Sequence, residues 1–256
     1  LDIPLDTLPP SNTLSLRLLT AADFETKTSY EVTVTATDND GVNSTPQDIT
    51  VTVKDLNDEA PVFTSNAAVT IDENETAVTT LTTTDADADS TVSYSITGGV
   101  DKDSFTIVSE ATGALTLTSA ADFETKTSYE VTVTATDNDG VNSTPQDITV
   151  TISDLNDEVP VFTSNASISI DENTTTVTTL ITTDADANST VSYSITDGID
   201  KDSFAVDQAT GDLTLKVNPN FESPVDSDND NVFKVTVTAT DNGGTISYRD
   251  YDQNLL

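Results

Sequence analysis

The chain has 256 residues, and its 45 Asp and Glu against nine Lys and Arg give a formal net charge of −36. No basic patch is available to neutralise phosphate, which excludes nucleic acid as a partner, and an anionic membrane surface would repel the chain. The chain contains neither Cys nor His, so disulfides are excluded and the common nucleophile–base pairs of enzymes are missing.

No apolar run approaches the ~18 residues that a transmembrane helix needs, and no signal peptide is visible. We expect an extracellular, cell-surface protein without direct membrane insertion, whose export address lies outside this sequence. Small extracellular domains without disulfides often use a metal ion as their brace instead.

The chain is a tandem repeat with a period of 99 residues. Residues 21–67 differ from residues 120–166 only at Val53/Ile152, Lys54/Ser153 and Ala60/Val159. The period predicts one repeat over 60–158 and another over 159–256. Residues 1–59 hold only the second half of a repeat, after a segment, 1–12, that matches no repeat. Such near-identity indicates one unit copied many times, so we expect neighbouring repeats of a longer chain.

Alternating apolar and polar residues predict β-strands along the whole chain. The first example in the half repeat is Tyr30, Val32 and Val34, which alternate with polar residues. Three strands are expected in this half repeat, a number that is marginal on its own. In the repeat 60–158, strands are expected near 67–71, 76–82, 91–97, 104–108, 114–118, 128–136 and 147–153. Seven short strands predict an all-β fold of tandem Greek-key sandwiches with antiparallel pairing.

Aromatic residues recur at the same offsets, as Phe63/Phe162, Tyr94/Tyr193, Phe105/Phe204 and Phe123/Phe221. We expect these side chains to pack in the core or at its rim. A platform for stacking carbohydrate would need exposed aromatic residues, and the chain has no Trp at all.

Acidic residues gather at strand ends and keep the same order in each repeat. The repeat 60–158 has Glu73 early, Asp85-Ala86-Asp87 after its second strand, Asp122-Phe123-Glu124 before its sixth, and Asp137 at the sixth strand's end. The linker Asp55-Leu56-Asn57-Asp58-Glu59 recurs as Asp154-Leu155-Asn156-Asp157-Glu158, and each copy is followed within two residues by a proline. Ligands that are all oxygen suit a hard cation such as Ca²⁺. The alternative is that these acids are solvated loop residues, as Asp2, Asp6, Glu75 and Glu110 are expected to be.

These five motifs, in this order and twice in register, resemble the calcium-binding motifs of cadherin repeats. The resemblance covers the chain from residue 13 onward. It implies Greek-key sandwiches joined by linkers that bind about three Ca²⁺ ions each. The near-identical copies and the lack of Cys resemble a bacterial surface adhesin more than an animal cadherin. Animal classical cadherins pair through an N-terminal Trp, which is absent here.

The resemblance also implies which residues hold the ions. At the first linker they are Asp23, Glu25, Asp55, Asn57, Asp58, Glu59, Asp85, Asp87 and Asp137. At the second they are Glu73, Asp122, Glu124, Asp154, Asn156, Asp157, Glu158, Asp184, Asp186 and Asp241, with Glu158 acting through its backbone carbonyl. The first linker lacks an early Glu from its own half repeat.

The last repeat departs from the pattern. Asn220-Phe221-Glu222 replaces Asp-Phe-Glu, and Tyr251-Asp252-Gln253-Asn254 is expected to be only the start of a linker, without its proline. An insert near 225–231 carries Asp226, Asp228 and Asp230, whose spacing suits either an additional calcium loop or an exposed acidic loop.

Three functions compete for this chain. The first is a calcium-rigidified extender of a cell-surface adhesin, which holds a distal binding region away from the cell. The second is a repeat that itself binds a glycan or a partner array in calcium-dependent adhesion. The third is an enzyme acting through paired carboxylates, which we reject because every clustered carboxylate already has a metal role.

Overall fold

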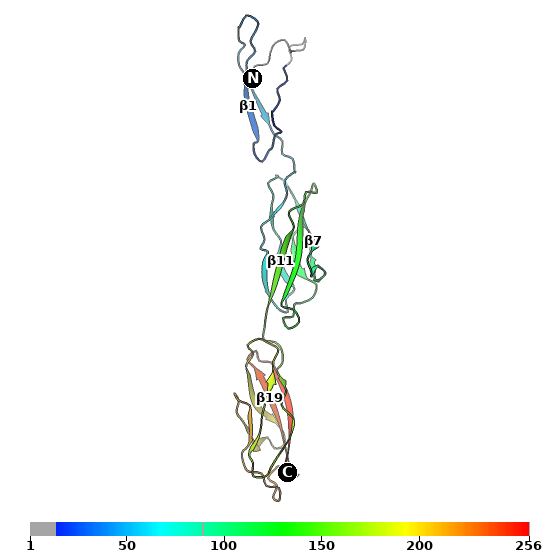
Figure 1. The fold of residues 1–256 in the computed structure, drawn as a ribbon, viewed down its shortest axis with the longest axis vertical. Helices are drawn as coiled ribbons and strands as arrows, with labels where there is room; N and C mark the ends of the chain where they lie inside the picture. Colours follow the sequence, from blue (N-terminus) through cyan, green and yellow to red (C-terminus); the bar gives the residue numbers. More distant parts are fainter. Residues whose placement is uncertain (1–13, 89, 256) are drawn as a thin grey trace. The chain divides into compact units, whose positions relative to one another are not determined.

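A computed structural model describes residues 14–88 and 90–255 of the chain (Figure 1). The segment 1–12, with Asp2 and Asp6, lies outside the described residues. Within the part that is described, no helix is long and apolar enough to cross a membrane.

The chain forms two compact units, and both take residues from the middle repeat. One unit consists of the described residues up to Ala67, of Thr79–Thr116 and of Glu130–Ile148. The other consists of Ala68–Val78, Leu117–Tyr129 and the residues from Thr149 onward. Each linker, with the loops that surround it, therefore lies inside a single unit.

The described residues form strands and two short 3-10 helices, η2 and η3. In the half repeat and the repeat 60–158 they are β1 (Ser29–Val34), β2 (Gln47–Thr52), β3 (Val62–Phe63), β4 (Ala68–Asp72), β5 (Ala77–Thr80), β6 (Thr83–Thr84), β7 (Val92–Gly98), η2 (Lys102–Ser104), β8 (Phe105–Ile107), β9 (Ala114–Leu117), β10 (Ser128–Asp137) and β11 (Gln146–Ser153). In the last repeat they are β12 (Val161–Phe162), β13 (Ser167–Ile170), β14 (Thr176–Thr179), β15 (Thr182–Thr183), β16 (Val191–Asp197), η3 (Lys201–Ser203), β17 (Phe204–Val206), β18 (Asp212–Leu215), β19 (Val232–Asp241) and β20 (Ile246–Leu255).

Both complete repeats have the same sheet topology, which confirms the predicted tandem all-β sandwiches. The repeat 60–158 has a four-stranded sheet of order β4-β11-β10-β7 and a three-stranded sheet of order β5-β9-β8. The last repeat has the orders β13-β20-β19-β16 and β14-β18-β17. The expected pairing was wrong in one respect, because β4 pairs with β11, and β13 with β20, in parallel.

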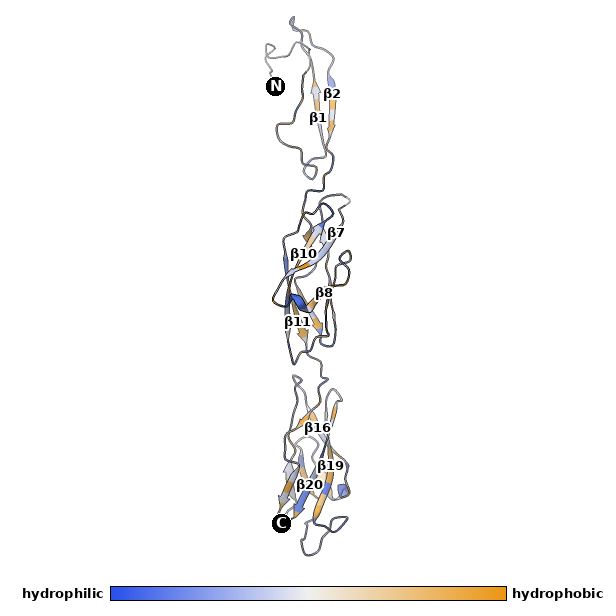
Figure 2. Ribbon diagram, turned by 90° about the vertical axis from the view of Figure 1, so that its right-hand side faces the viewer, coloured by the Kyte–Doolittle hydropathy of each residue, from blue (hydrophilic) through white to orange (hydrophobic). Residues whose placement is uncertain are grey.

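The period-two alternation has the predicted cause, since the apolar residues face a core. Val133, Ala135, Ile148 and Val150 have no exposed surface. Hydrophobic and hydrophilic residues are both present along the strands of these repeats (Figure 2). In the last repeat Leu213, Val237 and Ala239 are equally inaccessible. The aromatic residues follow the prediction with one exception, because the Phe221 side chain is 48% exposed.

The half repeat has two strands within residues 14–59, β1 and β2, and the expectation of three was wrong. Residues 15–18 correspond to β9 of the next repeat, which pairs with β5 and β8. The half repeat has no counterpart of those two strands among its described residues, and residues 15–18 form no strand there. As a consequence Val32 is 37% exposed, whereas its counterpart Val131 is 1% exposed.

The segment 251–254 is not the start of a linker, which corrects the expectation from sequence. It lies inside β20, where Tyr251 and Gln253 are 1% exposed and Leu255 is 7% exposed. The strand register explains the error, because Asp252 pairs with Ser167 as Thr149 pairs with Ala68. Asp252 therefore corresponds to a mid-strand residue and not to Asp154.

Gly113 ends the turn that precedes β9, with a φ of +67°, and an added Cβ would lie 2.6 Å from the Leu81 carbonyl oxygen. Gly140 has a φ of +90° but nothing within 4 Å of an added Cβ. We expect Gly113→Ala to lower the free energy of unfolding by about 3 kcal/mol, from left-handed strain and overpacking. Gly140→Ala should cost only the strain, about 1–2 kcal/mol. Urea unfolding of both variants measures the difference, and equal losses would contradict the packing argument.

Candidate metal centres

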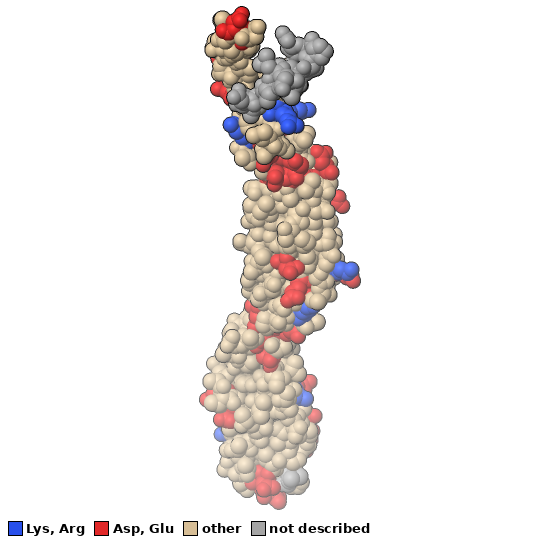
Figure 3. Space-filling model, turned by 45° about the horizontal axis from the view of Figure 1, so that its top comes forward, with Lys and Arg blue, Asp and Glu red and all other residues tan. Residues whose placement is uncertain are grey.

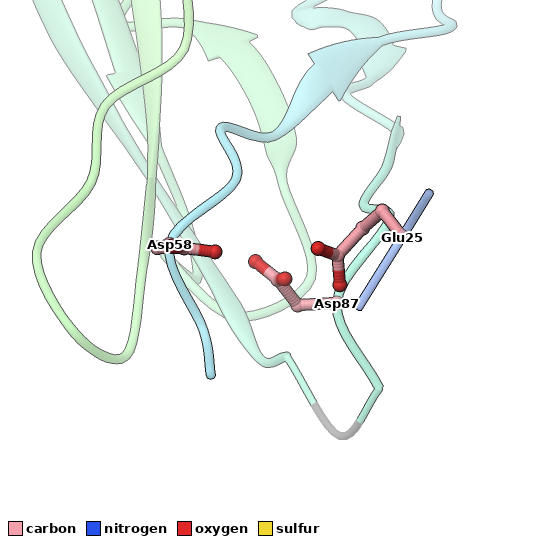
Figure 4. A group of neighbouring side chains, drawn as sticks. All are labelled: Glu25, Asp58 and Asp87. Atoms are coloured by element: carbon pink, nitrogen blue, oxygen red, sulfur yellow. The ribbon is translucent and has the colours of Figure 1, made fainter. Parts of the chain in front are cut away.

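The first linker brings three carboxylates together. Oxygens of Glu25, Asp58 and Asp87 lie within 4.8 Å of one another, and their side chains point toward a common centre (Figure 4). Glu25 lies in the turn before β1, Asp58 lies in the linker, and Asp87 follows β6. The three acids thus come from segments that are distant in sequence, as the sequence motifs predicted.

Hydrogen bonds at the first linker use one oxygen of each of two carboxylates and leave the other free. The Glu59 N–H donates to Asp87 Oδ2 at 2.8 Å, and the Ala88 N–H donates to Asp55 Oδ2 at 3.0 Å. Asp87 Oδ1 and Asp55 Oδ1 are buried without any hydrogen-bond partner. Backbone donors therefore engage one oxygen of each carboxylate and leave the other buried without a partner.

The second linker gathers a longer, continuous series of carboxylates. Three groups, each with oxygens within 4.8 Å of one another, are Glu73–Glu124–Asp157, Glu124–Asp154–Asp186 and Asp184–Asp186–Asp241. Glu124 and Asp186 each belong to two groups, so the three groups are joined. Acidic residues gather in separate patches on the face drawn in Figure 3, with uncharged surface between them.

The Asp154 and Asp186 carboxylates repeat the arrangement of the first linker. The Ala187 N–H donates to Asp154 Oδ2 at 2.8 Å, and the Glu158 N–H donates to Asp186 Oδ2 at 2.9 Å. Again Asp154 Oδ1 and Asp186 Oδ1 are buried without a partner. The same two backbone contacts therefore set the same two orphan oxygens at both linkers.

Glu73 is a buried brace between the second linker and the preceding repeat. It is 3% exposed, and it accepts the Leu155 N–H at Oε1, at 2.7 Å, and the Phe123 N–H at Oε2, at 2.9 Å. The half repeat has no such glutamate among its described residues.

Asp23 and Asp122, two predicted ligands, do not join the acidic groups. Each caps a turn, because Asp122 accepts both the N–H and the hydroxyl of Thr125, at 2.8 and 2.9 Å, and Asp23 accepts the same two groups of Thr26. The backbone N–H of Thr26 and then its hydroxyl lower the pKa of Asp23. Their metal role stays a prediction.

The metal role of the remaining predicted ligands stays a prediction, and the structure shows which of their oxygens lack a hydrogen-bond partner. Asp137 Oδ2, Asn57 Oδ1 and Asn156 Oδ1 are buried without a hydrogen-bond partner. Asp85 accepts the Asp87 N–H and the Ser90 hydroxyl, at 3.1 and 2.8 Å. Glu59 and Glu158 donate their backbone N–H groups to Asp87 and Asp186, and the Glu158 carbonyl accepts the Thr245 hydroxyl at 2.6 Å.

The electrostatics of the second linker are those of crowded anions. Burial raises the pKa of Glu124, and the charges of Glu73, Asp154 and Asp186 raise it further. Burial likewise raises the pKa of Asp186, and the neighbouring Asp184 adds to the effect. Burial alone would raise the pKa of Asp241 too, but hydrogen bonds from Thr245 and Gly244 outweigh it and lower that pKa.

A divalent cation fits this donor set. Within residues 14–88 and 90–255, none of the clustered linker carboxylates forms an ion pair with Lys or Arg. A buried charged oxygen without a partner is costly, and several of them converge here. Carboxylate, amide and carbonyl oxygens are the ligands of Ca²⁺, whose coordination is flexible enough for such mixed sets.

Acidic residues of the insert in the last repeat pair with a lysine side chain of the same repeat. Asp226, Asp228 and Asp230 also lie within 4.8 Å of one another. However, Lys234 Nζ lies 2.8 Å from Asp230 and 3.3 Å from Asp228, and the Asp230 bond is the main reason why its pKa is raised. Asp226 accepts the Asp230 N–H at 2.8 Å. Of the two alternatives from sequence, this geometry favours an acidic loop over a calcium loop.

Sequence reasoning missed residues that contact the second linker without being acidic. Asn74, with a φ of +65°, donates from Nδ2 to Asp157 Oδ2 at 2.6 Å. Asn242 and Thr245 contact the linker from the hairpin between β19 and β20. One sequence feature could have pointed to Asn242 and Thr245. This hairpin, Asp241-Asn242-Gly243-Gly244-Thr245, differs in sequence from its counterpart, Asp137-Asn138-Asp139-Gly140-Val141.

Two family models match the chain. The model described as "Cadherin domain" matches residues 67–153 and 166–251, and the model described as "Internalin K domain (D3/D4)" matches residues 3–53. The half repeat and the two complete repeats therefore match different models.

Similar proteins include large protocadherins. The chain is 34% identical to Protocadherin Fat 4 of Homo sapiens over 247 residues, which is 91% of this chain and 5% of that protein. It is 32% identical to human Protocadherin-16 over 245 residues, 89% of this chain and 7% of that protein. The chain thus spans a small part of the length of these relatives. The crystal structure of mouse Cadherin-23 EC22-24 superposes with a TM-score of 0.66 and 27% identity, covering 93% of this chain and 77% of that one.

We expect Glu73→Gln to leave the middle repeat less stable in chelator than Glu124→Gln, because the amide nitrogen introduced at position 73 can accept no hydrogen bond. One backbone N–H then loses a charged acceptor, which costs about 1.5–3 kcal/mol. Glu124→Gln is the matched control, since it removes a charge from the same acidic group, whereas Glu124 accepts neither the Leu155 nor the Phe123 N–H. Denaturant unfolding in EDTA compares the two, and a Glu73→Gln variant as stable as the control would rule out the brace.

Proposed function

Because this chain belongs to the cadherin family, we propose that Ca²⁺ bound at its two linkers holds neighbouring repeats rigid and makes the chain an extender of a cell-surface adhesin. Cadherin domains are extracellular, non-enzymatic adhesion domains that typically bind Ca²⁺ at the linkers between domains. The single observation that carries the proposal is the series of carboxylates at the second linker, with buried oxygens that no protein donor satisfies.

The proposed ligands, and the number of about three ions at each linker, are those that the resemblance to cadherin repeats implies, and oxygen ligands of this kind suit Ca²⁺. When bound, the ions supply positive charge among carboxylates that otherwise repel. This chain's own residues do the rest: the N–H groups of Glu59, Ala88, Glu158 and Ala187 orient the carboxylates, and Glu73 fixes the second linker to the repeat before it.

Charge arithmetic supports a rigidifying role. Like charges ~5 Å apart repel by about 3 kcal/mol per pair at an effective dielectric constant of 20. Repulsion of that size between loops of adjoining repeats would drive them apart without a cation. Matching most of the charge with divalent ions removes the repulsion and leaves the oxygen contacts to fix the geometry.

A role as a spacer in a bacterial surface adhesin is the more specific part of the proposal. It is supported by near-identical copies, by the absence of Cys and Trp, and by a half repeat that matches a different family model from the repeats that follow. An array of identical units suits a protein whose function depends on reach.

Calcium should raise the melting temperature of this chain and lengthen the particle. A ligand at 100 times its Kd stabilises by about 2.7 kcal/mol per site, so EDTA should lower the melting temperature by about 10 °C or more. Small-angle scattering over a calcium titration should show the maximum dimension rising with occupancy. Magnesium at equal ionic strength is the control, because Mg²⁺ demands octahedral geometry and dehydrates reluctantly. An identical response to both ions would make the effect simple screening and contradict the proposal.

Removing two linker charges should loosen the second linker but not the sandwiches. Asp154→Asn with Asp157→Asn keeps oxygen acceptors for the Ala187 N–H and the Asn74 amide, yet it removes two charges. We expect calcium affinity to fall at least about tenfold, because affinity follows the number of charged ligands.

The matched control for this double variant is Asp103→Asn with Glu110→Gln, which removes the same charge from exposed positions outside the acidic groups. Calorimetric titration measures affinity, and circular dichroism verifies that the strands are intact. If the linker variant bound calcium as tightly as the control did, the ligand assignment at this linker would be wrong.

A further inference from the structure

The two linkers have the same sequence but face different hairpins. Asp-Leu-Asn-Asp-Glu is common to both, whereas the hairpin after β10 carries Asp139 and Val141 where the hairpin after β19 carries Gly243 and Thr245. The two hairpins close in the same way, because the N–H groups of Gly140 and Gly244 both donate to the carbonyl of the aspartate that ends the strand. Position 139 therefore corresponds to position 243, and position 141 corresponds to position 245.

Gly243 lets the second hairpin lie against its linker. A Cβ at this position would overlap both the backbone carbonyl and the side-chain oxygen of Asn156. Its φ is not in the left-handed region, so the close approach and not the turn geometry requires glycine here. Asp139, the residue at this place in the first hairpin, carries a Cβ and could not approach its own linker so closely.

The closer approach creates a contact that the first linker lacks. Asn156 Nδ2 donates to Asn242 Oδ1 at 3.2 Å. Asn138 is the counterpart of Asn242 and is held identically, since each accepts a backbone N–H at Oδ1, from Thr91 and Thr190. Yet both amide atoms of Asn57, the counterpart of Asn156, are buried without a partner. The asparagines are the same at both linkers, so the side chain at position 139 or 243 makes the difference.

Thr245 adds a second contact. Its hydroxyl lies 2.6 Å from the Glu158 carbonyl oxygen and 2.6 Å from Asp241 Oδ2, and its single proton can bond only one of them at a time. A cation at Asp241 would leave the proton for the Glu158 carbonyl. Val141, the residue in the first hairpin, has no donor to offer Glu59.

We propose that the hairpin of the last repeat is a calcium-independent latch on the second linker, created by Gly243 and completed by Asn242 and Thr245. The latch opposes the carboxylate repulsion at the second linker, so this linker stays more ordered than the first when calcium is removed. The latch uses an amide pair and close packing and no carboxylate charge, so it stands whether or not calcium binds as proposed above.

Distances between spin labels in EDTA test the latch. The chain has no Cys, so cysteine pairs can be introduced at exposed, equivalent sites: Thr127 with Thr183 across the second linker, and Thr28 with Thr84 across the first. In the 256-residue chain, we expect the second pair's distance distribution to be at most about half as broad as the first pair's, since an ordered linker restricts the ensemble.

Exchanging the hairpin residues makes the test decisive. Gly243→Asp with Thr245→Val, which copies the first hairpin, should broaden the second distribution about twofold in EDTA. Asp139→Gly with Val141→Thr is the reciprocal variant and should narrow the first, so the test does not depend on one variant folding. A second distribution as broad as the first in the parent chain, or widths that neither exchange changes, would overturn the latch. Because every measurement is made in EDTA, these outcomes are independent of whether calcium rigidifies the chain.

Discussion

Repulsion among carboxylates at the linkers is the constraint on which this structure depends. Each sandwich places the ends of its strands, and the acids that follow them, next to a linker that is itself acidic. Like charges ~5 Å apart cost about 3 kcal/mol per pair at an effective dielectric constant of 20. The clustered carboxylates have no Lys or Arg partner among the described residues. The insert of the last repeat shows another arrangement, since Lys234 forms ion pairs with two of its three aspartates, Asp228 and Asp230.

Much of the fold follows from the alternation of residues. Val131 and Val133 in β10, and Ile148 and Val150 in β11, are apolar because every second residue faces the core, and that pattern is visible without coordinates. The parallel pairing of β4 with β11 was not visible, because alternation specifies which face is buried and not which strand lies alongside. The register of the last strand was not visible either: Tyr251 to Asn254 resemble a linker in composition, but the insert near 225–231 places β19 and β20 later than the 99-residue period predicts, so these residues lie in mid-strand.

The candidate site was predictable in its residue types and less so in their roles. The resemblance to cadherin repeats implied that Glu25, Asp58 and Asp87 meet, and the structure brings them together. Spacing could not indicate which oxygen a backbone N–H would use. Asp122 has both oxygens engaged by Thr125, Glu73 has both engaged by backbone donors, and Asp154 has one left over. Which oxygen is engaged depends on the local turns around each carboxylate, and the sequence motifs do not specify those turns.

The same allocation explains why the linkers are copied unchanged while the hairpins differ. Asp55 and Asp154 each give one oxygen to a backbone N–H and leave another buried and free, so a substitution there removes two functions at once. The residue at the hairpin tip, Asp139 in the middle repeat, does not combine two such functions. Asp139 is exposed, and its replacement by glycine leaves the closing bonds of the turn intact in the last repeat. Change is therefore cheapest at the residue that decides how closely hairpin and linker meet. An array of almost identical repeats can in this way hold linkers of unequal stiffness without altering the acids that they share.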